Sequence, residues 1–126
     1  MSELLTRART AARSAHLLLG AGDWRGAVDR AYYAMFDLAK HALREVDPKL
    51  AVARKHTTII ARFSKHVVQE KGYPRDLGRA LRRVFDARLV ADYSDAATTR
   101  EQATEVVEAM ERFFAFIAGN GGTDPK

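Results

Sequence analysis

Arg88 and Asp92 are the charged residues whose positions in the chain most strongly suggest chemistry. Residues 74–93 show helical periodicity, with an apolar stripe that includes Leu77, Leu81 and Val84. Arg88 falls in the middle of that stripe, and Asp92 follows one helical turn later. A guanidinium that faces a protein core is costly unless an acid pairs with it or it lies at a cleft.

Two interpretations of this pair follow from the residues. In the first, Arg88 and Asp92 form a structural i,i+4 ion pair near a helix end, or Arg88 bends outward to water. In the second, the stripe emerges into an opening, since Ser94 and Asp95 make the following segment polar, and Arg88 there contacts an anion. The residues alone favour neither interpretation.

His56 is the histidine best placed for acid–base work, because its unperturbed pKa lies near neutrality. It is in phase with Ile59 and Ile60, and a histidine on an apolar face more often serves as a core or capping residue. Tyr32 and Tyr33 are expected to pack in the core, with their hydroxyls reaching polar partners. Trp24 is expected to be structural, and Asp37 and His41 to form a surface i,i+4 contact.

The composition excludes several kinds of site. The chain has no cysteine, no paired histidines at i,i+4, no Glu-x-x-His pair and no glycine-rich phosphate loop. We therefore expect neither a metal nor a cofactor. The absence of cysteine fits a reducing compartment, and the apolar runs are too short for a signal sequence or a membrane span. The sequence thus predicts a cytoplasmic protein with no membrane partner.

The net charge of +5 is unevenly distributed along the 126 residues. Residues 1–53 carry 8 basic and 6 acidic side chains, residues 54–88 carry 10 and 3, and residues 89–126 carry 3 and 7. A basic middle segment can attract phosphate backbones, or it can pair with the acidic end in a dimer. The charge pattern mildly favours a nucleic-acid partner.

Five amphipathic helices are predicted from the 3.6-residue periodicity. They span about 2–19, 23–46, 54–71, 74–93 and 98–117. The expected N-caps are Ser2 and Asp23, and Thr98 is expected to form a capping box with Glu101. The expected core of the second helix runs from Trp24 to Val46, and that of the fifth includes Phe114 and Ile117.

Short connections between amphipathic helices favour antiparallel neighbours. The sequence therefore predicts an all-α fold, an up-and-down four-helix bundle with an additional C-terminal helix. Residues 1–118 are expected to form one helical domain, followed by a disordered tail over 119–126.

Four segments together resemble a bacterial and archaeal branch of the HEPN superfamily, over about residues 5–118. They are Gly22-Asp23-Trp24-Arg25-Gly26-Ala27, Arg30-Ala31-Tyr32-Tyr33-Ala34-Met35-Phe36, Lys55-His56-Thr57 and Arg88-Leu89-Val90-Ala91-Asp92-Tyr93. The order and spacing of the second and fourth segments make the resemblance fairly specific.

The resemblance implies a homodimer whose arginine motifs line one cleft. Many proteins of this superfamily are RNase toxins, neutralised by a small nucleotidyltransferase encoded nearby. Their motif, Arg-x-x-x-x-His, cleaves RNA without a metal: the histidine accepts the 2′-hydroxyl proton and the arginine stabilises phosphate charge. Arg88 matches the arginine, with Asp92 orienting it.

The chain departs from this motif at the histidine, because Tyr93 occupies that position. A tyrosine with an ordinary pKa near 10 is a poor general base at neutral pH. In a related branch the partner adenylylates a tyrosine two residues further on, but here that position is Asp95, so this modification does not carry over.

These observations leave three functional hypotheses. The first is a HEPN toxin-like component of a two-protein module with a nucleotidyltransferase, which binds RNA or nucleotide through Arg88, Asp92, Tyr93 and His56, with or without cleaving it. The second is a non-catalytic helical subunit that binds the partner or its nucleotide, which the replacement by Tyr93 favours. The third is a helical oligomerisation module with structural ion pairs.

Overall fold

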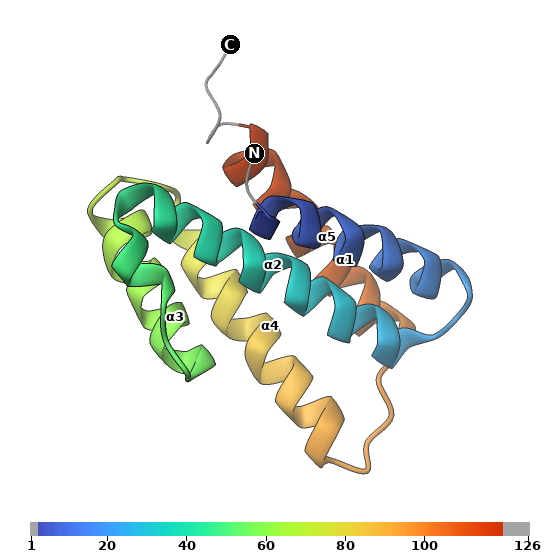
Figure 1. The fold of residues 1–126 in the computed structure, drawn as a ribbon. Coiled ribbons are helices and arrows are strands. Elements are labelled where there is room, and N and C mark those ends of the chain that lie inside the picture. The colour runs from blue at the N-terminus through green and yellow to red at the C-terminus, as the bar shows by residue number, and fades with distance from the viewer. Residues whose placement is uncertain (1–2, 120–126) are drawn as a thin grey trace.

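The computed structural model describes residues 3–119, which form a bundle of five helices (Figure 1). The helices are α1 (Glu3–Gly20), α2 (Trp24–Val46), α3 (His56–Arg62), α4 (Arg75–Tyr93) and α5 (Arg100–Phe113). A 3-10 turn, η1 (Pro48–Ala51), follows α2, and two π-helical segments, η2 (Phe63–Gln69) and η3 (Phe114–Ala118), continue α3 and α5. The prediction of an all-α helical bundle is confirmed.

The helix α2 lies at the centre and packs against each of the other elements, with α1 and α4 on opposite sides of it (Figure 1). Alanines at positions 27, 31, 34, 39 and 42 are buried and let neighbouring helices approach closely. Larger side chains fill the space between, above all Tyr32, Met35 and Leu38, which are fully buried. Close packing around α2 therefore builds the core.

The ends of the helices follow from local chemistry. The Asp23 side chain accepts a hydrogen bond from the Gly26 N–H at 2.9 Å, which confirms Asp23 as the N-cap of α2. Gly22 adopts a φ of 83°, in the left-handed region where glycine is least strained, and so allows the tight turn between α1 and α2. Asp47 ends α2 and caps η1 by accepting from the Lys49 N–H.

The start of α5 differs from the prediction by one residue. Thr99, not Thr98, is the N-cap: its hydroxyl accepts from the Gln102 N–H, and the Gln102 side chain accepts from the Thr99 N–H. The predicted partner Glu101 lies in the first turn and takes no part in this capping box. Both Thr98 and Thr99 are followed three residues later by a glutamate or a glutamine, as a capping box requires. The structure adopts the register with a glutamine at the third helical position.

Other boundaries and core positions also need correction. The third predicted helix, expected over 54–71, consists of α3 and η2 and runs from His56 to Gln69. The π-helical segment η2 brings both Val67 and Val68 into the core. At the C-terminus of α5, Phe113 is fully buried while Phe114 is only half-buried.

Three further expectations lie at the ends of elements. On α2, Trp24 is half-buried and Val46 is exposed, so the core stripe is shorter than predicted. The proposed cap Ser2 and residues 120–126 of the tail lie outside the described residues, and Gly119 is helical. Between residues 3 and 119, no helix has both the length and the apolar character needed to cross a membrane.

We predict that Gly26→Ala destabilises the protein, although alanine ordinarily stabilises a helix by up to about 1 kcal/mol relative to glycine. A Cβ at position 26 would lie 2.5 Å from the Asp23 carboxylate, so the cap must move. In an Asp23→Ala background, which itself costs about 1 kcal/mol, the same change should raise the free energy of unfolding. Urea unfolding of the four proteins tests this, and Gly20→Ala, which meets no atom within 4 Å, is the control. Stabilisation by Gly26→Ala in the wild-type background would contradict the prediction.

Candidate functional site

The Arg88 side chain bridges α4 and α2. Its Nε donates a hydrogen bond of 2.7 Å to Asp29, and its Nη2 donates one of 3.0 Å to the Tyr33 hydroxyl. The predicted partner Asp92 is more distant, with 3.8 Å between Nη2 and the carboxylate. Arg88 is therefore held mainly by the neighbouring helix, and the i,i+4 pair on its own helix is the weaker contact.

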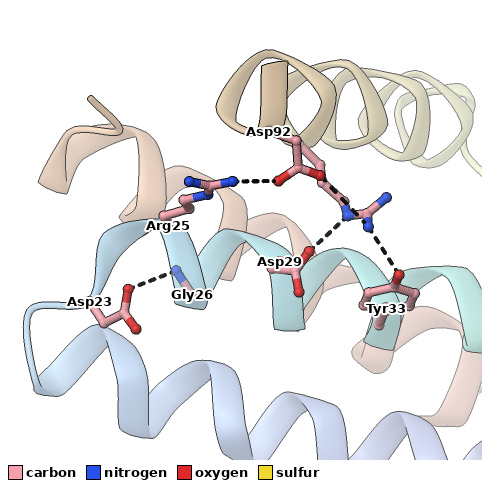
Figure 2. Close-up of polar contacts among 7 residues, drawn as sticks. Asp23, Arg25, Gly26, Asp29, Tyr33 and Asp92 are labelled. Atoms are coloured by element: carbon pink, nitrogen blue, oxygen red, sulfur yellow. Dashed lines mark hydrogen bonds and ion pairs between the residues drawn. The ribbon is translucent and has the colours of Figure 1, made fainter. Parts of the chain in front are cut away.

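Asp92 forms its shorter contact with a second arginine. Its other carboxylate oxygen accepts a hydrogen bond of 3.1 Å from Arg25 on α2, so that Asp92 lies between the two guanidinium groups (Figure 2). Arg25, Asp29, Tyr33, Arg88 and Asp92 form a connected group, which we call the Arg88 cluster. Two arginines and two aspartates give this cluster a formal charge of zero.

The helical geometry of α2 explains how the cluster forms. Arg25, Asp29 and Tyr33 are spaced four residues apart and so lie along one face of α2. The Arg88 guanidinium lies over that face, with its Cζ 4.9 Å from the centre of the Tyr33 ring and 5.3 Å from that of Tyr32. Both distances are within the range of cation–π attraction. The carboxylates of Asp29 and Asp92 and the two tyrosine rings thus offset the cost of placing the Arg88 charge on the inner stripe of α4.

The Arg88 guanidinium keeps its charge and part of its surface. Burial disfavours the charged form, but the hydrogen bond to Asp29 and the nearby Tyr33 and Asp92 outweigh this, and the pKa of Arg88 is raised. The side chain remains 20% exposed. Its Nη1 has no hydrogen-bond partner among residues 3–119. Arg88 is thus a fixed cation with donor capacity left for an anion.

His56 lies beside Tyr32, whose ring also contacts the Arg88 guanidinium. Its Nδ1 shares a hydrogen bond of 2.7 Å with the Tyr32 hydroxyl, and its ring stacks on Phe36 with 4.1 Å between ring centres. Burial, Arg88 and Lys40 lower the pKa of His56 below its usual value. Burial also raises the pKa of Tyr32, which keeps that hydroxyl protonated. His56 is therefore a neutral, aromatic-packed residue that is coupled to Arg88 by charge rather than by a hydrogen bond.

Tyr93 does not join the Arg88 cluster. It is the last residue of α4, and its side chain is 85% exposed. Five residues of a regular helix correspond to about 140° of rotation, so Tyr93 points away from the side that carries Arg88. Of the four predicted site residues, the structure brings Arg88 and Asp92 together, places His56 nearby against Tyr32, and leaves Tyr93 apart.

Asp37 and His41 do not form the predicted surface pair. Asp37 is buried, and its carboxylate lies 3.6 Å from Arg7 of α1. Burial raises the pKa of Asp37, although Arg7 and Lys40 oppose that effect. The Nδ1 of His41 is buried and finds no hydrogen-bond partner among residues 3–119, and burial lowers the pKa of His41. The prediction was wrong because neighbouring helices cover this part of α2.

Sequence reasoning missed Asp29 and Arg25. It expected the Tyr33 hydroxyl to reach a polar partner, but it did not identify Arg88 as that partner. Tyr32 is fully buried as expected, whereas Tyr33 is half-buried and holds Arg88. The available signal was the four-residue spacing of positions 25, 29 and 33, which places an acid and a hydroxyl on one face of α2. That face could be matched to Arg88 only once the packing of α2 against α4 was known.

Comparison with known proteins gives a family match over nearly the whole chain. The family model described as "HEPN domain" matches residues 1–120. A protein from Methanocaldococcus jannaschii named "Putative toxin MJ0605" is 36% identical over 93 residues, which cover 71% of this chain and 65% of that protein.

Two further relatives carry the name "UPF0332 protein". The one from Pyrococcus horikoshii is 35% identical over 96 residues, covering 75% of this chain and 58% of the relative. The one from Thermotoga maritima is 29% identical over 96 residues, covering 76% and 70%. The matched region thus spans less than two thirds of the first two relatives. No solved structure gives a significant match.

We predict that Asp29, rather than Asp92, dominates the contribution of the Arg88 cluster to stability. Asp29→Ala removes the 2.7 Å hydrogen bond to a largely buried guanidinium and should cost about 1–3 kcal/mol. Asp92→Ala breaks contacts of 3.1 and 3.8 Å, one of them to the exposed Arg25, and should cost less than about 1 kcal/mol. Urea unfolding measures both costs, and the reverse order would show that the i,i+4 pair is the structural one.

We predict that His56 makes the protein less stable as the pH falls below about 6.5. Because the folded-state pKa is lowered, the unfolded chain binds this proton first, so the free energy of unfolding decreases until the pH passes the folded-state pKa. An NMR titration of the His56 ring reports that pKa directly. In Arg88→Met, which removes one of the charges responsible, the pKa should rise. An unchanged pKa in that variant would disprove the coupling.

Proposed function

Because this chain belongs to the HEPN family, we propose that it is the toxin-like component of a two-protein module with a nucleotidyltransferase, and that it contacts RNA through Arg88. The name of the M. jannaschii relative supports the toxin-like role. The resemblance to family members encoded beside a nucleotidyltransferase supports the partner. The homodimer belongs to the same proposal, since it would bring two Arg88 groups into one cleft.

The observation that carries the proposal is the way Arg88 is held. Asp29 and Tyr33 fix the Nε and Nη2 atoms, and Nη1 is left for a ligand. A guanidinium pre-oriented in this way loses little conformational freedom when it binds a phosphate oxygen. A residue with a purely structural role would not need to leave a donor and part of its surface available.

We further propose that the protein binds RNA with weak or no intrinsic cleavage. Cleavage without a metal requires a base that accepts the 2′-hydroxyl proton beside the phosphate. Within one subunit Tyr93 is poorly placed for this role, because it is 85% exposed and lies about 140° around the helix from Arg88. The Nδ1 of His56 is engaged by Tyr32, which leaves Nε2 as its remaining nitrogen.

A second candidate function, a non-catalytic subunit that binds a partner protein, is favoured by a groove between α4 and α5. The groove has a volume of about 520 Å³, and residues such as Ala87, Val106 and Ala109 give it an apolar floor. Asp76 and Arg112 form an ion pair at its rim, with contacts of 2.5 and 3.0 Å. An apolar floor with a charged rim is a common arrangement in protein-binding sites. The two candidate functions differ in their need for Arg88: the proposed RNA contact requires it, whereas the groove between α4 and α5 is not lined by it.

We predict that induced expression of the protein alone slows bacterial growth, and that co-expression of the proposed nucleotidyltransferase partner relieves the effect. Arg88→Met should abolish the growth defect, because methionine keeps much of the side-chain length and removes the guanidinium. Val84→Ala is the matched control: it removes buried methyl groups from the same helix, so it destabilises the protein but keeps Arg88. If both variants lose toxicity, stability rather than the guanidinium accounts for the result.

The same proteins are then assayed for RNA cleavage in a chelator, with Tyr93→Phe and His56→Gln added. We expect little cleavage by the wild type. Robust wild-type cleavage that Tyr93→Phe abolishes would make Tyr93 catalytic, and cleavage that only His56→Gln abolishes would make His56 the base. Either result would contradict the proposal of binding without cleavage. A wild type with no effect on growth would contradict the toxin-like role and favour the partner-binding subunit.

A further inference from the structure

The outward face of α4 is strongly basic. A helix turns about 100° per residue, which places Arg75, Arg79, Arg82 and Arg83 within an arc of about 100°, on the side opposite Arg88. All four are exposed. Asp86 is the single acid in that arc. We call these four arginines the arginine stripe.

The arginine stripe is largely without ion partners. Arg88 and Arg112 are bound to carboxylates at 2.7 and 2.5 Å. Among residues 3–119, by contrast, Arg75, Arg79 and Arg83 make no ion pair, and Arg82 lies 3.5 Å from Asp86 with both side chains more than half exposed. Exposed pairs of this kind contribute little. The stripe therefore exposes most of its positive charge to solvent, although Arg79 interacts with Asp76 and Arg83 lines a groove that also contains Glu105 and Glu108.

An exposed aromatic ring continues the same face. Tyr93 lies in line with Arg75 at the other end of α4 and is 85% exposed, and Val90 between them is 58% exposed. Among the described residues, Tyr93 is the one aromatic side chain with such exposure. From Arg75 to Tyr93 the helix rises about 27 Å. Basic groups followed by an open aromatic ring are the features that bind single-stranded nucleic acid.

The charge balance of the Arg88 cluster gives a second, basic surface a role in the proposed RNA binding. With a formal charge of zero, the cluster can orient a phosphate but adds little long-range attraction. The outward face of α4, with the four arginines of the stripe and Asp86, supplies that attraction. The two surfaces meet at the end of α4, where Tyr93 directly follows Asp92 in the chain.

We propose that the outward face of α4 binds single-stranded RNA, with phosphates on the arginine stripe and a base stacked on Tyr93. This inference rests on the proposed function and specifies where the RNA runs. The strand follows α4 from Arg75 toward Tyr93, and its end reaches the Arg88 cluster. Single strands are preferred to duplexes, because only an unpaired base can stack on the ring.

The test is fluorescence anisotropy with the full-length protein and a labelled single-stranded RNA of about 12 nucleotides, within the usual site size. The triple variant Arg75→Gln/Arg79→Gln/Arg82→Gln should bind at least about ten-fold more weakly. The affinity of the triple variant should also depend less on salt. The slope of log affinity against log salt concentration should be shallower by about 0.7 for each phosphate that the variant no longer neutralises. Its matched control carries the same charge change at three exposed arginines of α1 and α2: Arg9→Gln/Arg13→Gln/Arg30→Gln. The control should bind as the wild type does.

Tyr93 variants test the stacking. Tyr93→Ala should weaken binding roughly ten-fold, the effect of removing one stacked base, while Tyr93→Phe keeps the ring and should bind normally. Because the changed residues are exposed, thermal unfolding should show all variants folded.

Several outcomes would overturn the inference. Equal binding by the two triple variants would place the RNA elsewhere and leave the proposed RNA target standing. No binding by the wild type would remove both. If Tyr93→Ala binds normally and polyglutamate competes as well as unlabelled RNA, the face recognises an acidic protein instead.

Discussion

The burial of α2 on nearly all sides is the constraint on which the rest of the structure depends. A polar side chain that α2 buries loses its contact with water, so most such groups are paired with a group from a neighbouring element. On α2, Asp29 and Tyr33 accept hydrogen bonds from Arg88 of α4. Tyr32 is hydrogen-bonded to His56 of α3, and Asp37 forms an ion pair with Arg7 of α1. These contacts specify which faces of the surrounding helices turn inward. The apolar contacts supply most of the cohesion, because hydrophobic burial is the dominant favourable term in folding.

The same constraint separates two properties that the proposed RNA binding requires. Burial against α2 forces the inner arginine to be paired, so Arg88 is well oriented but lies in a group with no net charge. The outer arginines of α4 have no such requirement, so they stay charged and largely unpaired in water. Orientation and attraction therefore reside on opposite faces of one helix. A ligand that contacts both Arg88 and the outer arginines has to pass around the end of α4, where Asp92 and Tyr93 are adjacent.

The fold could be predicted largely because periodicity and capping are local. The buried side chains of α4 and the N-cap Asp23 follow from residues a few positions apart. The shift of the capping box from Thr98 to Thr99 reflects two local solutions of similar quality. The candidate site was harder to predict, because its main contact joins residues 29 and 88. Charge and spacing identified Arg88, but its partner depends on how α2 packs against α4. The same packing buried Asp37, whose spacing from His41 had indicated a surface pair.

Tyr93 shows why a motif read along the sequence differs from a site in space. Positions 88 and 93 can face one ligand within a subunit only if the helix ends between them, since five helical residues separate side chains by about 140°. Here α4 continues through Tyr93, and the Ser94 N–H still bonds to the Val90 carbonyl. Helix continuity therefore fixes position 93 outward whichever side chain it carries. An imidazole there could reach a phosphate on Arg88 only from a second subunit or after the last turn of α4 unwinds. Replacing the family's histidine by tyrosine thus changes the outer surface of α4 and leaves the inner cluster intact.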